Sequence, residues 1–183
     1  IDNQSYPEFE KIKKTLKVDP FEYLNQQSVN LKDFKNTPFI YENYSPASRE
    51  KRQYFTKENA LKIDYIRQKI ETWLKDKLLL EHEYYYLLAG LIEAVPFISN
   101  IAGTYGAYLK HWDKRAYKKI ELIKLETLNN NKNNISYNLD SENLIKKISG
   151  DIIYIDPPYN SRQYAPNYHL LETISKYDYP EIY

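Results

Sequence analysis

The octapeptide IIYIDPPY, residues 152–159, decides the fold that this sequence predicts. Its first four residues are apolar and three of them are isoleucine, a composition typical of a β-strand that is buried on both faces. Pro157 and Pro158 lack a backbone N–H group and have a fixed φ, so the strand must end at Asp156. The stretch therefore predicts a central strand that runs into a rigid turn.

The residues before this stretch predict a second strand and a connecting helix. Residues 135–139 are predicted to be a short strand, and residues 141–148 a short helix with Ser141 as its N-cap. Strand, helix and strand in this order form a parallel βαβ unit, so the predicted fold class is α/β. Ligands of open α/β sheets bind at the carboxyl ends of the strands, where Asp140 and Asp156 would lie on one edge.

The middle of the chain predicts a largely helical region over residues 56–119. Thr56 is a suitable N-cap for its first helix, residues 56–78. Apolar residues recur at three- and four-residue steps, as one buried helix face requires, at Ala60, Ile63, Ile66, Ile70 and Trp73. A second helix is predicted over residues 82–95, and Pro96 ends it.

A basic stretch follows these helices, between residues 100 and 119. Gly103 and Gly106 predict a shaped loop at its start, because glycine allows a positive φ and a close backbone approach. Aromatic and basic side chains then alternate. The candidates for contacts to nucleic-acid phosphates or base edges are Tyr105, Lys110, Lys114 and Arg115. The alternative is a solvated basic face, which runs of charge commonly are.

The composition excludes several other classes of protein. The 183 residues carry 26 Lys and Arg and 25 Asp and Glu, so a nucleic-acid contact has to come from a local basic patch. The absence of Cys excludes disulfides, thiol catalysis and cysteine zinc sites, and with no secretory signal it favours the cytoplasm. No apolar run approaches the roughly 20 residues of a membrane-spanning helix.

The turn formed by DPPY carries groups that suit the recognition of a flat amino group. The Asp156 carboxylate and the Pro157 carbonyl are two acceptors held side by side, as the exocyclic amino group of adenine would require. The ring of Tyr159 offers a face on which a base can stack. Arg162 and Gln163 follow and are candidates for holding that base or its phosphate. A plain Asp-Pro turn and an exposed loop are the structural alternatives.

The same tetrapeptide resembles the catalytic motif of amino-group methyltransferases that use S-adenosylmethionine. Longer stretches, one of which contains the motif, resemble the adenine-specific DNA methyltransferases of the D12 class: residues 43–56, 59–73, 100–116, 151–164 and 169–183. The likeness runs from about residue 39 to the end of the sequence. Because cytosine-amino and some RNA enzymes share the tetrapeptide, the longer stretches are what favour DNA adenine.

This resemblance implies a Rossmann-like methyltransferase sheet, present in part, with a largely helical insertion that recognises DNA. Residues 1–55, in which segment 38–46 looks extended, would be a remnant of the catalytic domain with a linker. Residues 56–119 would be the insertion, and residues 120–183 the catalytic βαβ portion. The implied reaction transfers a methyl group from S-adenosylmethionine to N6 of an adenine flipped out of double-stranded DNA. The implied partner is a cognate restriction endonuclease in a restriction–modification system.

The resemblance also assigns roles to individual residues. The implied catalytic residues are Asp156, Pro157, Pro158 and Tyr159. The implied cofactor-binding residues are Asp140 and Asp156. The implied DNA-binding residues are Tyr105, Lys110, Lys114, Arg115, Arg162 and Gln163. No metal is implied, and the three histidines lack the spacing of metal ligands.

One motif of that class does not occur in these residues. The glycine-rich FxGxG loop, which binds the methionine part of the cofactor, matches none of the four glycines. The first residue is Ile rather than Met, so we expect that the sequence does not include the true start of the protein. Two other functions therefore stay open: an RNA adenine methyltransferase, and a noncatalytic nucleic-acid-binding fragment without the cofactor loop.

Overall fold

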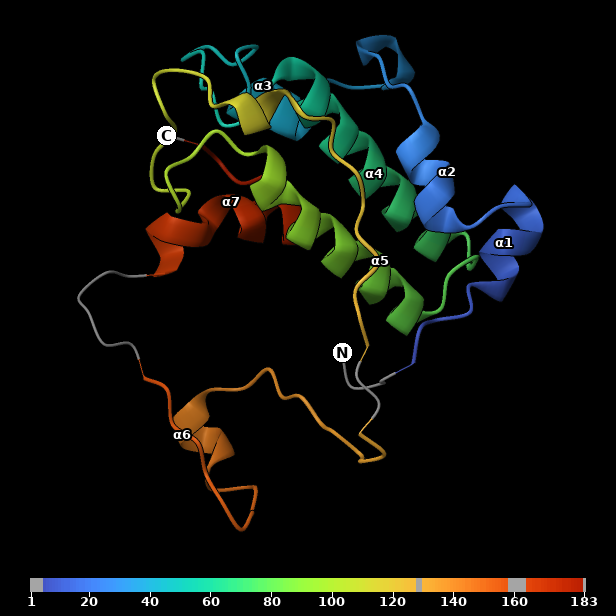
Figure 1. Ribbon diagram of the computed structural model, residues 1–183, viewed down its shortest axis with the longest axis vertical. Coiled ribbons are helices and arrows are strands. Elements are labelled where there is room, and N and C mark those ends of the chain that lie inside the picture. Colours follow the sequence, from blue (N-terminus) through green and yellow to red (C-terminus); the bar gives the residue numbers. More distant parts are fainter. Residues whose placement is uncertain (1–4, 128–129, 158–163, 183) are drawn as a thin grey trace.

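Helices α4 (Lys57–Lys75) and α5 (Glu81–Ala94) pack against each other at the centre of the molecule (Figure 1). The computed structural model describes three ranges of the chain: residues 5–127, 130–157 and 164–182. Helix α3 (Phe39–Tyr44) packs against α4, and helix α7 (Tyr164–Lys176) packs against α5. Segments from both ends of the sequence therefore meet on this central pair.

The remaining elements of the described chain are shorter. They are α1 (Glu10–Leu16), α2 (Pro20–Gln26), η1 (Leu31–Asp33), η2 (Val95–Ile98), η3 (Lys114–Tyr117) and α6 (Ser141–Leu144). The rings of Phe9, Phe21 and Tyr86 meet edge to face, with centroids 5.9 to 6.3 Å apart. This aromatic cluster fastens the first two helices to α5.

The predictions of the two central helices are confirmed. The Thr56 hydroxyl oxygen accepts a hydrogen bond from the Asn59 N–H (3.2 Å), so Thr56 is the N-cap of α4. All five residues of the predicted apolar stripe are buried in the core. Burial of such a stripe, rather than helix propensity, supplies most of the stability of a helix in a folded protein.

Helix α4 also carries buried polar side chains that bond to the backbone of other segments. They are Asn59, Lys62, Asp64 and Arg67. Lys62 Nζ donates to the carbonyl oxygen of Leu24 (2.5 Å) and to that of Gln27, at the carboxyl end of α2. Burial lowers the pKa of Lys62 to about 8. The terminal backbone groups of a helix have no hydrogen-bond partner within that helix. Buried side chains of α4 supply such partners where water cannot reach.

Asp64 caps helix α3, in a segment that the sequence predicted to be extended. Its carboxylate oxygens accept hydrogen bonds from the N–H groups of Ile40 (3.0 Å) and Tyr41 (2.9 Å). The Tyr177 hydroxyl, directly after α7, donates to the same carboxylate (2.5 Å). The prediction for residues 38–46 was wrong because the side chain that caps this helix lies 24 residues further along the chain.

An extended segment, residues 118–123, follows η3 and runs across the central helices (Figure 1), and Asn59 holds its start. Asn59 Nδ2 donates to the carbonyl oxygens of Ala116 (3.0 Å) and Lys118 (2.8 Å). Its Oδ1 accepts from the Ile120 N–H (3.1 Å). These bonds satisfy backbone groups that a neighbouring strand would satisfy in a sheet, so the segment is extended without belonging to one.

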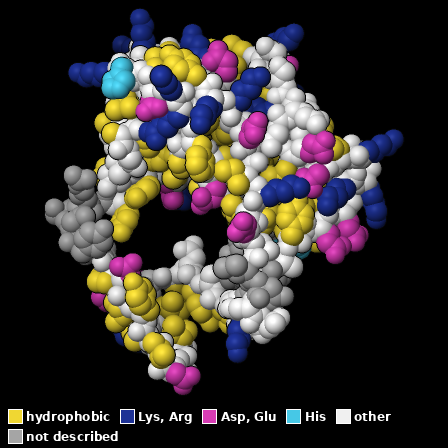
Figure 2. Space-filling view, in the orientation of Figure 1, with side chains coloured by type: hydrophobic (Ala, Val, Ile, Leu, Met, Phe, Trp, Pro, Cys, Tyr) yellow, Lys and Arg dark blue, Asp and Glu magenta, His cyan; other side chains and the backbone are white. Residues whose placement is uncertain are grey.

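The predicted parallel sheet is not confirmed. In the described part of the chain, the one bridge between extended backbones is an isolated antiparallel pair, Ile101 with Tyr108. Residues 135–139 and 152–155 form no strand and are exposed, and Ile152 has 91% of its surface exposed. Figures 1 and 2 show both segments, with α6 beside them, apart from the central helices. A strand that is apolar on both faces needs neighbouring strands and helices to cover it, and the described residues do not supply them.

Replacement of Asp64 should change how stability depends on pH. Burial raises the pKa of the Asp64 carboxyl from 3.8 to about 6, so the folded protein holds this proton more tightly than the unfolded chain. Ionisation of Asp64 therefore lowers stability as the pH rises from about 4 to above 6, by about 3 kcal/mol. Asp64→Asn cannot ionise, so its free energy of unfolding should rise by that amount relative to wild type across this window. Urea unfolding at several pH values measures the difference.

Glu71→Gln is the control for this measurement. Burial tends to raise the pKa of Glu71, but the hydrogen bond and charge of Arg67 outweigh it and lower the pKa. A lowered pKa has the opposite sign, because the ionised carboxylate then stabilises the fold as the pH rises. If the difference between wild type and Asp64→Asn did not change with pH, the ionisation of Asp64 would play no part in stability.

Candidate functional site

The predicted catalytic tetrapeptide lies at a border of the described residues. Asp156 and Pro157 are exposed and belong to no helix or strand. Four other predicted site residues lie outside the described part of the chain: Pro158, Tyr159, Arg162 and Gln163. The described chain resumes at Tyr164, where α7 begins. The position of α7 therefore sets where the chain returns to the helices after the tetrapeptide.

Arg67 on α4 binds the carboxyl end of α7. Its Nε donates to the carbonyl oxygen of Ile174 (3.1 Å), and its Nη2 donates to that of Ser175 (3.1 Å). Nη2 also donates to the Tyr84 hydroxyl of α5 (2.9 Å). The guanidinium lies over the rings of Tyr84 and Tyr177, at 5.6 and 5.5 Å from their centroids. One buried side chain thus joins α4, α5 and α7.

The other end of α7 lies against residues 101–114, which we call the basic loop. The Tyr105 N–H donates to the Asn167 carbonyl oxygen (2.8 Å). Gly106 lies close enough that a Cβ atom there would be 3.6 Å from the carbonyl oxygen of Pro166 and from Asn167 Oδ1. The stretch predicted to contact DNA is therefore adjacent to the helix that follows the tetrapeptide, although the two are far apart in the sequence.

Asn100 shapes the basic loop from inside the core. Its side chain is fully buried, and Nδ2 donates to the carbonyl oxygens of Gln53 and Leu109 (both 3.0 Å). Its Oδ1 accepts from the Asp113 N–H (2.9 Å). Asn100, which directly precedes the loop, thereby holds the second half of the loop at Leu109 and Asp113. The sequence analysis did not single it out, because these bonds depend on backbone groups that only the folded loop brings to it.

Two of the predicted DNA-contact residues are exposed and one is buried. Lys110 and Lys114 are exposed on the basic loop, and Figure 2 shows Lys and Arg side chains gathered over the upper part of the molecule, where this loop lies. Tyr105 is only 2% exposed, and its hydroxyl is hydrogen-bonded with the Ser99 hydroxyl (3.2 Å). Burial raises the pKa of the Tyr105 hydroxyl. This corrects the prediction for the Tyr105 side chain, which packs into the core instead of facing DNA.

Arg115 and Asp140, two further predicted site residues, are engaged in the fold. The half-buried Arg115 guanidinium donates to the carbonyl oxygen of Ile101 at the start of the basic loop. Asp140 is exposed and caps α6 by accepting a hydrogen bond from the Asn143 N–H (3.1 Å). The predicted cap, Ser141, is instead the first residue of that helix.

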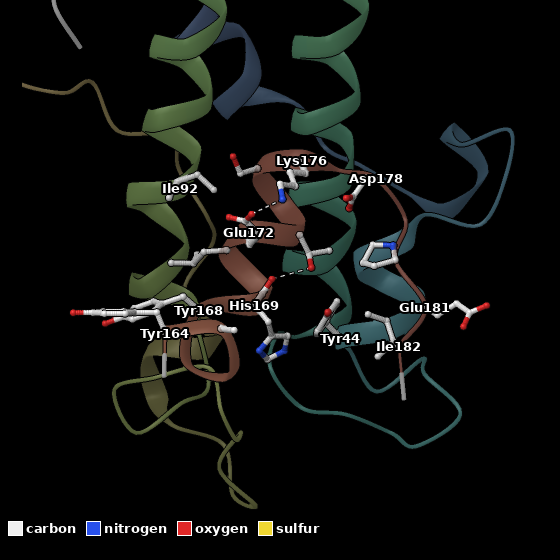
Figure 3. A pocket seen from close by; sticks show the side chains of 15 residues that line it. Tyr44, Ile92, Tyr164, Tyr168, His169, Glu172, Lys176, Asp178, Glu181 and Ile182 are labelled. Carbon is white, nitrogen blue, oxygen red and sulfur yellow. Dashed lines mark hydrogen bonds and ion pairs between the residues drawn. The ribbon is translucent and has the colours of Figure 1, made fainter. Parts of the chain in front are cut away.

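A groove of about 900 Å³ runs along α7 (Figure 3). Tyr164 and Tyr168 lie side by side at one end of it. Apolar and hydroxyl-bearing side chains line much of the rest, together with three acidic residues, Glu172, Asp178 and Glu181, and with Lys176, which is ion-paired with Glu172 (2.6 Å). The sequence analysis missed the two tyrosines. The signal that could have found them is their four-residue spacing just after the tetrapeptide, which places both rings on one helix face.

The part of the chain that the structure describes contains neither a cluster of metal ligands nor a membrane-spanning helix. No group of three or more His, Asp or Glu side chains in that part is placed to hold a metal ion. None of the helices described there is long and apolar enough to cross a membrane.

A comparison with known families identifies the class of the chain. Residues 7–183 match the model of one family, described as D12 class N6 adenine-specific DNA methyltransferase. Because the match covers nearly all of the sequence, the chain belongs to this family. No solved structure matches the chain.

Several modification methylases are similar in sequence. Type II methyltransferase M.FokI from Planomicrobium okeanokoites is 54% identical over 183 residues, which are 100% of this chain and 28% of that protein. Modification methylase StsI from Streptococcus sanguinis is 48% identical over 100% of this chain and 27% of that protein. Type II methyltransferase M.NlaIII from Neisseria lactamica is 45% identical over 76% of this chain and 42% of that protein. The chain thus spans less than half the length of these relatives.

Charge reversal at Lys110 and Lys114 should weaken DNA binding and reduce its salt dependence. Each phosphate contact that is lost lowers the slope of log affinity against log salt concentration by roughly 0.9, so two contacts lower it by roughly 1.8. Titration of a DNA duplex with the Lys110→Glu, Lys114→Glu double variant over a salt series measures this slope. Lys11→Glu with Lys17→Glu is the matched control. Lys11 is exposed on α1 and Lys17 is exposed directly after it, and α1 lies far from the basic loop in Figure 1. An unchanged slope, or an equal change in the control, would indicate that the basic loop is a solvated charged surface that does not bind DNA.

Proposed function

We propose that this chain contains catalytic and DNA-recognition regions of a site-specific DNA methyltransferase that methylates adenine at N6. The observation that carries the proposal is the DPPY tetrapeptide, in a chain that belongs to the D12 family over residues 7–183. The relatives are Type II methyltransferases and modification methylases by name, which supports a role in a restriction–modification system. Double-stranded DNA is the proposed substrate and a cognate restriction endonuclease the proposed partner.

The proposed chemistry depends on two hydrogen-bond acceptors at the tetrapeptide. The lone pair of adenine N6 is delocalised into the ring, so the amino group is a poor nucleophile. If the Asp156 carboxylate and the Pro157 carbonyl accept hydrogen bonds from its two N–H groups, the lone pair is localised on nitrogen, which makes the amino group a better nucleophile. This is catalysis by positioning and electrostatic preorganisation, with no covalent intermediate on the protein.

The adenine has to leave the duplex to reach these acceptors. Flipping a base costs on the order of a few kcal/mol, and stacking on the Tyr159 ring would return about 1–3 kcal/mol. Arg162 and Gln163, the two residues directly before α7 in the sequence, are proposed to hold the flipped base or its phosphate. Lys110 and Lys114 on the basic loop are proposed to bind neighbouring phosphates.

S-adenosylmethionine is the methyl donor that we propose, since methyltransferases of this family generally use it. The resemblance to the family assigned Asp140 and Asp156 to the binding of this cofactor, but the two residues do not form a binding site for it. Asp140 is an exposed helix cap, and Asp156 is exposed as well. The FxGxG loop does not occur in these residues. We therefore assign no cofactor contact to the described residues.

The finer fold belongs to the same proposal. We propose that residues 135–139 and 152–155 are strands of a Rossmann-like parallel sheet in the assembled enzyme, within a catalytic portion over residues 120–183. The exposed apolar side chains of Ile152, Ile153 and Ile155 support this, because such a run is stable only when both of its faces are covered. The helical region 56–119 would be the insertion that recognises DNA, and residues 1–55 would be an N-terminal remnant of the catalytic domain with a linker.

Asp156→Ala should abolish methyl transfer and leave DNA binding largely unchanged, because it removes an acceptor for the amino group and no phosphate contact. Loss of one preorganised electrostatic contact of this kind lowers kcat by about 10²–10³-fold. The assay is mass spectrometry of N6-methyladenine in nucleosides from DNA incubated with S-adenosylmethionine and the protein expressed from its complete reading frame. Asp151→Ala is the matched control, because Asp151 is exposed on the same segment and precedes the apolar run.

The outcomes of this assay separate the candidate functions. Near-normal turnover of the Asp156→Ala variant would indicate that the tetrapeptide is a structural turn without a catalytic role. Methylated adenine in RNA but not in DNA would favour an RNA adenine methyltransferase, the alternative that shares the motif. Binding to DNA without methylation by the wild-type protein would favour a noncatalytic nucleic-acid-binding role.

A further inference from the structure

Tyr164 and Tyr168 form a stacked pair on the surface of α7. Their ring centroids are 5.9 Å apart and their planes differ by 25°. The two residues are 62% and 43% exposed, whereas Tyr44, Tyr54 and Tyr86 of the same chain are buried. Exposed aromatic rings leave apolar surface in water, so a parallel pair of them is an unused stacking surface.

The fold holds this pair in place from both ends of α7. At the carboxyl end, Ile174 is fully buried and its carbonyl oxygen is bound by Arg67. At the amino end, the Tyr105 N–H binds the Asn167 carbonyl oxygen. A helix anchored in this way presents its side chains in a fixed direction, which reduces the entropy lost when a ligand binds to them.

The charges around the pair indicate what kind of molecule it can accept. The basic loop lies against the same turn of the helix, directly below Tyr164 in Figure 3, and carries exposed Lys110 and Lys114. The groove on the other side of the pair contains three acidic side chains, Glu172, Asp178 and Glu181, and one basic side chain, Lys176, which is ion-paired with Glu172 (2.6 Å). Its balance of charge is therefore negative and repels an anion. An occupant with an uncharged flat group at the tyrosines and a negative charge toward the basic loop satisfies both conditions. A nucleotide in a DNA strand has this arrangement of groups.

We infer that Tyr164 and Tyr168 form a stacking platform for an unstacked base of the bound DNA, while the basic loop holds the adjacent phosphates. This inference rests on the proposed function, since it takes DNA as the substrate, and it adds a base contact distinct from the one proposed for Tyr159. The platform begins at the first residue of α7, a few residues after the tetrapeptide. The residues that stack this base are therefore close in the protein sequence to the residues proposed to receive the flipped adenine.

The test compares two single-stranded probes of equal length and charge. One is a fluorescently labelled thymidine oligonucleotide, and the other carries abasic residues in place of its internal bases. The ratio of their dissociation constants isolates the contribution of the bases, because the phosphates are the same. The protein is expressed from its complete reading frame as wild type, Tyr164→Ala with Tyr168→Ala, Tyr164→Phe with Tyr168→Phe, and Tyr85→Ala. Tyr85 is the matched control, an exposed tyrosine on α5 whose ring also contacts a neighbouring tyrosine.

The alanine double variant should lose roughly 5- to 150-fold in affinity for the thymidine probe, the contribution of one stacked base. Its affinity for the abasic probe should stay at the wild-type value, which also shows that the variant is folded. The phenylalanine double variant keeps the ring faces and should keep the wild-type ratio, as should Tyr85→Ala.

Three results would overturn the platform. They are an unchanged ratio in the alanine variant, an equal loss for both probes, and an equal loss in the phenylalanine variant. An unchanged ratio is what a platform covered by another protein segment would give. None of these readouts requires methyl transfer. The stacking proposal can therefore be wrong for a protein that is an active methyltransferase, and it can be correct for a protein that is inactive.

Discussion

The structure depends on the need of buried helix ends for hydrogen-bond partners. The first N–H groups and the last carbonyls of a helix have none within the helix, and burying them unpaired is costly. Helix α4 supplies these partners from its own buried polar side chains. Asp64 receives the N–H groups of α3, Lys62 donates to the end of α2, and Arg67 donates to the end of α7. Elements that are distant in sequence are thereby fixed around one helix.

The consequence for function lies at α7. Its carboxyl end is bound by Arg67, and its first residue, Tyr164, follows the last residue of the tetrapeptide by five positions in the sequence. The bond from the Tyr105 N–H to Asn167 places the basic loop at the same end. The helical region therefore brings the candidate DNA-binding loop and the helix after the tetrapeptide to one place. In the proposed enzyme, this arrangement lets the region that binds DNA determine where the flipped base arrives.

The sequence predicted the features whose causes are local. Helix α4 was predicted from its apolar stripe and its Thr56 cap, and both are encoded within a few residues. Helix α3 was not predicted, because its cap is Asp64. The burial of Tyr105 could not be predicted either, because its loop is shaped by Asn100 and contacts from distant segments. The predicted strands at 135–139 and 152–155 remain unconfirmed, since a strand forms only beside a neighbour.

In the candidate site too, features with a local cause were predicted from the sequence, and features that depend on the fold were not. The tetrapeptide was recognised from its residues alone, because two prolines and an acid after an apolar run form a distinctive local pattern. Its two acceptors and Tyr159 remain predictions, since the described residues reach only Pro157. The stacked tyrosines of α7 were missed, although their spacing is visible, because exposure and ring geometry appear only in the fold.

Native-state hydrogen exchange of this chain tests the central claim that α7 is fixed to α4 as one unit. If Arg67 and the buried face of α7 hold it there, the amides of residues 170–176 should exchange with an opening free energy within about 1 kcal/mol of those of residues 66–70 in α4. The exposed segment 135–157 should exchange with little protection. Exchange of the α7 amides as fast as that exposed segment, while α4 stays protected, would contradict the claim.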